Sequence, residues 1–222
     1  MTAAPATGRG ASAPRILITG FGPFPGVEEN RSARLVRALT GGRAVRLSGA
    51  HVRAVVLPVA WAIASRRAIR EALSFRPHAV LHFGVSSRAD SFRLETRASN
   101  ARECLPDCLG CTPGAAADRP HTKPATFDIR PALSALRRAG IAAEPSDCAG
   151  AYLCNHVFYE SLTAQEFEGG ALVGFVHIPH NGMARSLREA EPASGALLMK
   201  GARMLIAEAA RQVRLALLLR RV

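Results

Sequence analysis

The stretch Arg15-Ile16-Leu17-Ile18-Thr19, followed by Gly20, decides how the rest of this chain of 222 residues is interpreted. It is a short run rich in β-branched and aliphatic residues that stops at a glycine, which is typical of a buried strand. The same pattern returns at residues 79–83, which stop at Gly84, and an apolar run without polar interruption covers most of 171–178. These runs predict the interior strands of one sheet.

Segments with helical periodicity lie between the strand-like runs. They cover roughly 32–39, 61–75, 131–139, 149–162 and the chain from about Ala193 onward, with a further apolar run at 52–59. Apolar runs that alternate with helices predict a doubly wound α/β/α sandwich with a mostly parallel central sheet. We expect a flexible N-terminal tail over residues 1–14 and a single catalytic α/β domain over residues 15–222.

Composition narrows the class of protein. The formal net charge is +12, but the basic residues are scattered and aromatic residues make up only 5% of the chain, so we expect no nucleic-acid partner. No segment approaches the roughly 18–20 apolar residues of a membrane span, and the first residues hold no apolar signal-peptide core. We therefore expect a cytoplasmic protein with no membrane partner.

Cysteine usage raises the question of chemistry. Five cysteines, an odd number, favour reduced thiols over a disulfide framework. Cys154 lies in Ser146-Asp147-Cys148-Ala149-Gly150-Ala151-Tyr152-Leu153-Cys154-Asn155, where Ser146 or Asp147 could cap a following helix. In the first turns of that helix the macrodipole would favour a thiolate, although a helical cysteine is more often a small core residue.

A histidine and a carboxylate could activate that thiol. His177 lies in Gly174-Phe175-Val176-His177-Ile178-Pro179, at the end of a predicted strand, where it could serve as general base. His180 is a rival for this role, and His156 is a weaker one. Glu95, within Phe92-Arg93-Leu94-Glu95-Thr96-Arg97, could orient the imidazole, or it could be a surface charge paired with a neighbouring arginine.

The loop after the first strand, Gly20-Phe21-Gly22-Pro23-Phe24-Pro25-Gly26, resembles a phosphate-binding turn only superficially. Pro25 stands where a third glycine would be needed, and proline offers no N–H group to a phosphate. Two exposed-looking phenylalanines, Phe21 and Phe24, could line a small apolar pocket at the edge of the sheet, or they could cap the core.

Taken in order, these segments resemble the pyroglutamyl-peptidase I (pyrrolidone-carboxylate peptidase) family over about residues 15–215. The family's T-G-F-x-P-F, E-x-x-A-x-N, S-x-x-A-G-x-Y-hydrophobic-C-N and F-hydrophobic-H-hydrophobic-P segments match this chain at Thr19–Phe24, Glu95–Asn100, Ser146–Asn155 and Phe175–Pro179. The cysteine segment is the most specific part.

The resemblance implies a cysteine peptidase that removes N-terminal pyroglutamate from peptides, with no cofactor and no metal. It implies Cys154 as nucleophile, His177 as base, Glu95 as its orienting group, and Phe21 and Phe24 as walls of the lactam site. Relatives also suggest a homo-oligomer, either a tetramer or a dimer.

Three alternatives stay open. The chain departs from some bacterial members at Val85, which follows Gly84 in place of Gln, although other branches share this residue, and it departs from the usual Thr or Asp at Cys148. These two positions permit a diverged hydrolase acting on another small amide or ester. The spacing of Cys104, Cys108 and Cys111 is that of an iron–sulfur triad in radical enzymes, or could hold zinc with His121 as a fourth ligand. A nucleic-acid binder would rest on net charge alone.

Overall fold

The computed structural model describes residues 13–24, 26–114, 119–168, 170–179 and 191–219. The strands are β1 (Arg15–Phe21), β2 (Val45–Leu47), β3 (Ala50–Leu57), β4 (Ala79–Ser86), β5 (Phe92–Glu95), β6 (Arg97–Ser99), β7 (Thr122–Pro124), β8 (Ala143–Ser146) and β9 (Leu172–Pro179). The helices are α1 (Arg31–Thr40), α2 (Ala64–Phe75), α3 (Ile129–Arg138), α4 (Leu153–Glu168) and α5 (Glu191–Leu219).

A seven-stranded sheet in the order β2-β3-β1-β4-β9-β5-β8 forms the centre of the molecule. The four strands β3, β1, β4 and β9 run parallel, whereas β2 is antiparallel to β3 and β5 is antiparallel to β9. The predicted α/β sandwich with a mostly parallel sheet is confirmed. The three apolar runs singled out in the sequence are β1, β4 and β9, which lie side by side at its centre.

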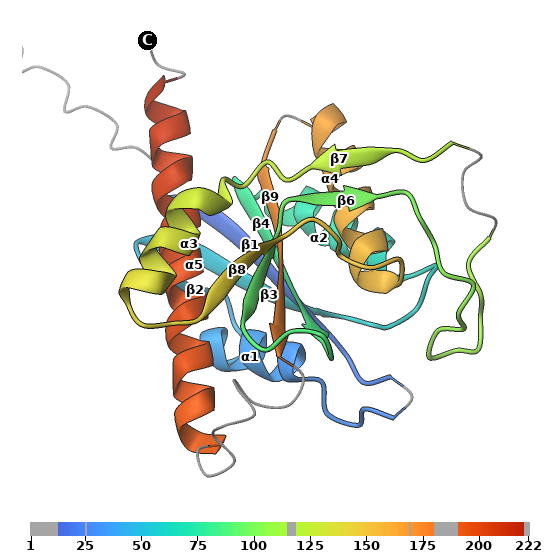
Figure 1. The fold of residues 1–222 in the computed structure, drawn as a ribbon. Helices are drawn as coiled ribbons and strands as arrows, with labels where there is room; N and C mark the ends of the chain where they lie inside the picture. Colours follow the sequence, from blue (N-terminus) through green and yellow to red (C-terminus); the bar gives the residue numbers. More distant parts are fainter. Residues whose placement is uncertain (1–12, 25, 115–118, 169, 180–190, 220–222) are drawn as a thin grey trace, which may run out of the picture.

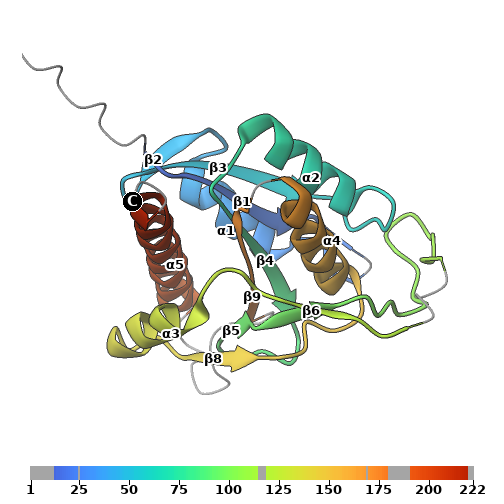
Figure 2. The same ribbon diagram turned by 90° about the horizontal axis from the view of Figure 1, so that it is seen from above.

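Helices cover both faces of this sheet (Figures 1 and 2). On one face α1, α3 and α5 enclose a hydrophobic cluster that includes Phe83, Phe92 and Val176. On the other face α2 and α4 enclose a second cluster that includes Phe21, Phe158 and Phe175. Because successive residues of a strand point to opposite faces, each central strand contributes side chains to both clusters. We call the second side the α2/α4 face.

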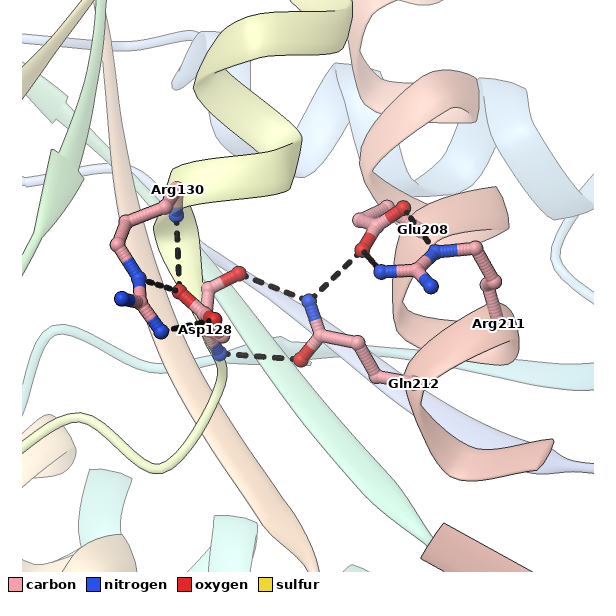
Figure 3. Close-up of polar contacts among 5 residues, drawn as sticks. All are labelled: Asp128, Arg130, Glu208, Arg211 and Gln212. Carbon is pink, nitrogen blue, oxygen red and sulfur yellow. Dashed lines mark hydrogen bonds and ion pairs between the residues drawn. The ribbon is translucent and has the colours of Figure 1, made fainter. Parts of the chain in front are cut away.

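Polar contacts fix α3 against α5 on the first face (Figure 3). Asp128 caps α3 by accepting a hydrogen bond from Arg130 N, and its own backbone N–H donates to Gln212 Oε1 at 3.0 Å. Gln212 Nε2 in turn donates to the Asp128 carbonyl at 2.8 Å and to Glu208 at 3.0 Å. Through these bonds the side chain of Gln212, on α5, satisfies both the backbone N–H and the carbonyl of Asp128 at the start of α3.

Several element boundaries differ from those predicted. Helix α2 begins at Ala64 rather than near Trp61, and α3 begins at Ile129 with Asp128 as its cap. The helix expected over 149–162 begins only at Leu153 and continues to Glu168, because Gly150 has a left-handed backbone (φ 81°) that a helix does not use. The predicted loop over 100–125 also contains β7, which pairs with β6.

Residues 1–12 of the predicted tail lie outside the described residues. Pro14, at its end, is buried, and its carbonyl accepts a hydrogen bond from His51 N at 2.7 Å. Within the described residues, no helix combines the length and apolar character that crossing a bilayer requires.

Candidate active site

Three side chains from different elements meet on the α2/α4 face. His177 Nδ1 on β9 lies 2.8 Å from Glu95 Oε1 on β5. The same imidazole is hydrogen-bonded to the thiol of Cys154 on α4. The structure therefore brings together the three residues that the sequence singled out, and each of them comes from a different segment of the chain.

The sheet register explains how the histidine and the carboxylate meet. Strand β5 runs antiparallel to β9, with Arg93 opposite His177 and Leu94 opposite Val176. Glu95 is therefore displaced along the strand from His177 and reaches it as a diagonal neighbour on the same face. The imidazole also packs against the ring of Phe175, at a centroid distance of 4.8 Å.

Glu95 is not a surface charge. Its side chain is fully buried, while the neighbouring arginines pair elsewhere: Arg93 with Glu144 at 3.2 Å and Arg97 with Asp147 at 2.8 Å. The reading of Glu95 as an exposed partner of Arg93 or Arg97 was wrong, because its side chain is fully buried and lies against His177 of β9. A buried carboxylate needs a partner, and here that partner is His177.

The imidazole is held in its charged form. Burial alone would lower the pKa of His177, but hydrogen bonds to Cys154 and Glu95 and the charges of these two groups raise the pKa to about 9. At neutral pH this favours a protonated imidazole beside the sulfur of Cys154.

Cys154 is the second residue of α4, nearer to the helix start than the sequence suggested. The first N–H groups of a helix have no acceptor within the helix and carry the positive end of its dipole. The predicted capping role of Ser146 or Asp147 was wrong: Ser146 ends β8 and accepts a hydrogen bond from Cys148 N, and Asp147 pairs with Arg97.

Asn155 ties the start of α4 to the chain that follows β6, a role that the sequence did not reveal. Its side chain is buried, its Oδ1 accepts from Ser99 N at 2.8 Å, and its Nδ2 donates to the carbonyls of Ser99 and Ala101. The residue after the cysteine therefore fixes the helix to the segment that carries Glu95 at its other end. Its place directly after Cys154 was the only signal in the sequence.

The loop after β1 is held from both sides. Asn30 caps α1 and donates to the carbonyl of Gly22, and Ser32 Oγ accepts from Phe21 N at 2.8 Å. A side chain at Gly20 would collide with the carbonyl of Ser32, so this close approach requires glycine. The loop is thus a rigid connection from β1 to α1.

The two phenylalanines of this loop differ in environment. Phe21 is only 3% exposed and packs against Phe175, so the expectation that it is exposed was wrong. Phe24 is half-buried against the same cluster. Only Phe24 offers part of its ring to solvent.

The rival histidines are distinguished by position. His156 lies on α4 against Trp61, with Nε2 3.4 Å from Ser65 Oγ; burial first, and then the charge of Arg102, lower its pKa to about 4. It is neutral at physiological pH, and its partners are structural ones. His180 lies outside the described residues.

The cysteine-rich loop is organised by a carboxylate rather than by its thiols. Asp107 is buried and accepts backbone hydrogen bonds from Trp61, Leu109 and Cys111 at 2.8–2.9 Å. Cys104, Cys108 and Cys111 are exposed free thiols. In the part of the chain that the structure describes, no three His, Cys, Asp or Glu side chains are grouped so as to hold a metal ion.

The two departures from the family pattern contribute no side chain to the group that contains Cys154. Val85 packs against the cluster on the opposite face of the sheet, the one covered by α1, α3 and α5. Cys148 is exposed in the segment between β8 and α4. Neither residue belongs to the group formed by Cys154, His177 and Glu95.

Comparison with known proteins places this site in a family. A family model described as pyroglutamyl peptidase matches residues 14–199. The pyrrolidone-carboxylate peptidase of Pyrococcus furiosus is 31% identical over 75% of this chain and 81% of its own length, and that of Cupriavidus taiwanensis is 33% identical over 88% and 93%. The solved structure of the pyrrolidone carboxyl peptidase from Thermococcus litoralis superimposes with a TM-score of 0.79 at 25% identity, covering 90% of this chain and 95% of that one. The chain belongs to the pyroglutamyl peptidase family.

Proposed function

We propose that this protein is a cysteine peptidase that hydrolyses the bond after an N-terminal pyroglutamyl residue of peptides. Cys154 acts as the nucleophile, His177 as general acid and base, and Glu95 as the group that orients the imidazole. The observation that supports this most strongly is the continuous contact from the thiol of Cys154 through His177 to the buried carboxylate of Glu95. Membership of the family supplies the substrate class.

Acylation uses the charges already present in the site. The Cys154 thiolate attacks the carbonyl carbon that joins pyroglutamate to the next residue, so that a C–S bond forms. N–H groups at the start of α4 hold the negative oxygen of the tetrahedral intermediate. His177 gives its proton to the leaving nitrogen as the C–N bond breaks, which releases the shortened peptide and leaves a thioester.

Deacylation restores the starting state. Neutral His177 takes a proton from a water molecule, whose oxygen attacks the thioester carbonyl. The C–S bond then breaks, the sulfur leaves as thiolate beside the reformed imidazolium, and pyroglutamate is released. Throughout both steps Glu95 keeps the Nδ1 side of the ring occupied, so that only Nε2 faces the reaction.

The substrate offers an uncharged lactam ring where most N-terminal residues carry an ammonium group. A partly exposed aromatic ring such as Phe24, backed by Phe21 and Phe175, suits such a flat apolar group. Phe24 then lines the lactam site directly, and Phe21 supports it from within the core.

The test compares release of a chromogenic amine from pyroglutamyl, prolyl and glutaminyl amides. We expect the wild type to prefer the pyroglutamyl amide and Cys154→Ala to lose the activity. Cys148→Ala, in the segment before α4, serves as the matched cysteine control and should retain both activity and preference. Turnover by Cys154→Ala at the wild-type rate would refute the mechanism, and a preference for another amide would indicate a diverged hydrolase.

A further inference from the structure

We infer that Gly84 is a positioning residue, whose missing side chain provides the space in which the sulfur of Cys154 lies beside His177. This inference rests on the proposed function, because it concerns the same thiol. Gly84 supplies no functional group to the reaction. Its role is to leave room for one.

The atoms that a side chain at Gly84 would contact show how narrow this space is. A Cβ atom built on Gly84 would lie 2.8 Å from Cys154 Sγ, 2.8 Å from Phe175 Cζ and 3.0 Å from Phe175 Cε1. These separations are well below ordinary van der Waals contact. Gly84 lies within the extended strand β4, so the requirement is for the absence of a side chain and not for an unusual backbone conformation.

Strand register places this gap next to the imidazole. In the parallel pairing of β4 with β9, Gly84 lies opposite His177, and His82 lies opposite Phe175. Alternation along the strand puts Gly84 and His177 on the α2/α4 face, from which Cys154 approaches. A sulfur atom lying over Gly84 is therefore beside the histidine that shares its proton.

The two neighbours of the missing side chain differ in their freedom to move. The ring of Phe175 is buried and is held by Phe21, His82 and Phe158 at centroid distances of 6.3, 6.0 and 5.7 Å. The sulfur is the free end of a short side chain with a single rotatable bond. An added methyl group would therefore turn Cys154 to another rotamer, away from His177.

Gly84→Ala tests this, with Gly174→Ala as the matched control. A Cβ at Gly174 on β9 would meet Phe127 at 3.0 Å and Leu81 at 3.1 Å, so it crowds the core in the same sheet without approaching the sulfur. The measurement is the rate at which iodoacetamide alkylates Cys154 as a function of pH, read on the Cys154 peptide by mass spectrometry. Both variants are also assayed for kcat and KM.

We expect Gly84→Ala to slow the alkylation of Cys154 at neutral pH and to change its pH profile, because the sulfur no longer lies beside His177. Its kcat should fall on the order of 100-fold, as for a misplaced catalytic group. Gly174→Ala should keep the wild-type pH profile even if its Tm falls. An alkylation profile and kcat equal to the wild type in Gly84→Ala would overturn the inference.

A second measurement isolates the contact with sulfur and needs no substrate. Replacing Cys154 by Ala removes Sγ, so Gly84→Ala should lower Tm less in the Cys154→Ala background than in the wild type. If Gly84→Ala alone does not fold, Gly84→Ala/Cys154→Ala should still fold. Equal loss of Tm in both backgrounds, together with a wild-type alkylation profile in Gly84→Ala, would assign the crowding to Phe175 alone and contradict the inference.

The outcomes separate this inference from the proposed function. Alkylation and Tm report on the sulfur whatever the enzyme hydrolyses, so they stand even if pyroglutamyl amides are not substrates. Conversely, a wild type that hydrolyses pyroglutamyl amides through Cys154, together with an indifferent Gly84→Ala, would leave the proposed function intact and remove only the role of Gly84.

Discussion

The carboxylate of Glu95 and the imidazole of His177 form a 2.8 Å contact across 82 residues of sequence, and the carboxylate has no exposure to solvent. The imidazolium of His177 therefore balances the negative charge of Glu95. This pair explains why His177 keeps its proton despite burial.

Glu95→Gln should keep the shape of the side chain and remove its charge. Without that charge, the pKa of His177 falls and the thiolate form of Cys154 loses its partner, so we expect kcat/KM to drop by about 10²–10⁴-fold. The control is Glu144→Gln, on the adjacent strand β8, whose half-exposed carboxylate pairs with Arg93. A Glu95→Gln enzyme with wild-type kcat/KM would show that the carboxylate does not support the histidine.

The alkaline side of the pH–rate profile should report the same pair. His177, with a pKa of about 9, must be protonated to give its proton to the leaving nitrogen, so kcat/KM should fall as pH rises through about 9. In Glu95→Gln this fall should begin at lower pH. An alkaline limb that does not move between the two enzymes would assign it to another group.

The buried His82 should make stability depend on acid. Burial lowers its pKa to about 3 in the folded state, where it bridges Thr19 Oγ1 at 2.7 Å and Ser161 Oγ at 3.1 Å. Between pH 6.5 and 3, His82 is protonated in the unfolded chain but stays neutral in the folded one. The free energy of unfolding therefore falls as pH falls. The slope from this residue is about 1.4 kcal/mol per pH unit.

Urea titrations at pH 4, 5, 6 and 7 measure that slope. In His82→Gln it should be shallower by up to one proton, although the variant is less stable at neutral pH. His51→Gln, at an exposed position on β3, is the matched histidine control, and His82→Gln should change the slope more. A slope unaltered in His82→Gln would mean that other groups cause the acid sensitivity.

Asp107→Ala should loosen the cysteine-rich loop. The carboxylate accepts backbone hydrogen bonds from Trp61, Leu109 and Cys111, and its loss leaves these donors without their acceptor. We expect a Tm lower by several degrees and faster proteolysis within 100–112. Asp90→Ala, at an exposed position, is the comparison, and equal Tm values for the two variants would refute this role.

Replacing Cys104, Cys108 and Cys111 together by Ser should leave kcat/KM within about twofold of the wild type. These thiols are exposed, and the hydrogen bonds of the loop use its backbone groups, Asp107, Trp61 and Tyr152. Metal analysis of the anaerobically purified wild type should find no stoichiometric iron or zinc. Loss of activity in the triple variant, together with a bound metal, would restore the metal alternative.

Sequence reasoning located the parts of this fold that bury continuous apolar surface. Strands β1, β4 and β9 were predicted because their residues are apolar on both faces. It did not find β8, whose Ala-Glu-Pro-Ser sequence is largely exposed and becomes a strand only by pairing with β5. Edge strands owe their structure to neighbours that are distant in sequence.

The sequence predicted the three residues of the site, but it did not predict their geometry. Local sequence could not decide between a surface and a buried Glu95, because its partner, His177, comes from another strand. The space beside Gly84 was equally hidden, since it is defined by Cys154 and Phe175 after folding. The expected cytoplasmic location and homo-oligomeric state stay predictions, which fractionation and sedimentation would test.

The two faces of the sheet differ in their roles. All groups assigned to the chemistry lie with α2 and α4, while α1, α3 and α5 enclose the larger of the two apolar clusters. A mutant library made to raise thermal stability can therefore be restricted to the side of α5, where substitutions should leave kcat unchanged. Conversely, substrate preference can be redesigned around Phe24, while the stability of the opposite half of the molecule offsets the destabilisation that new loops cause.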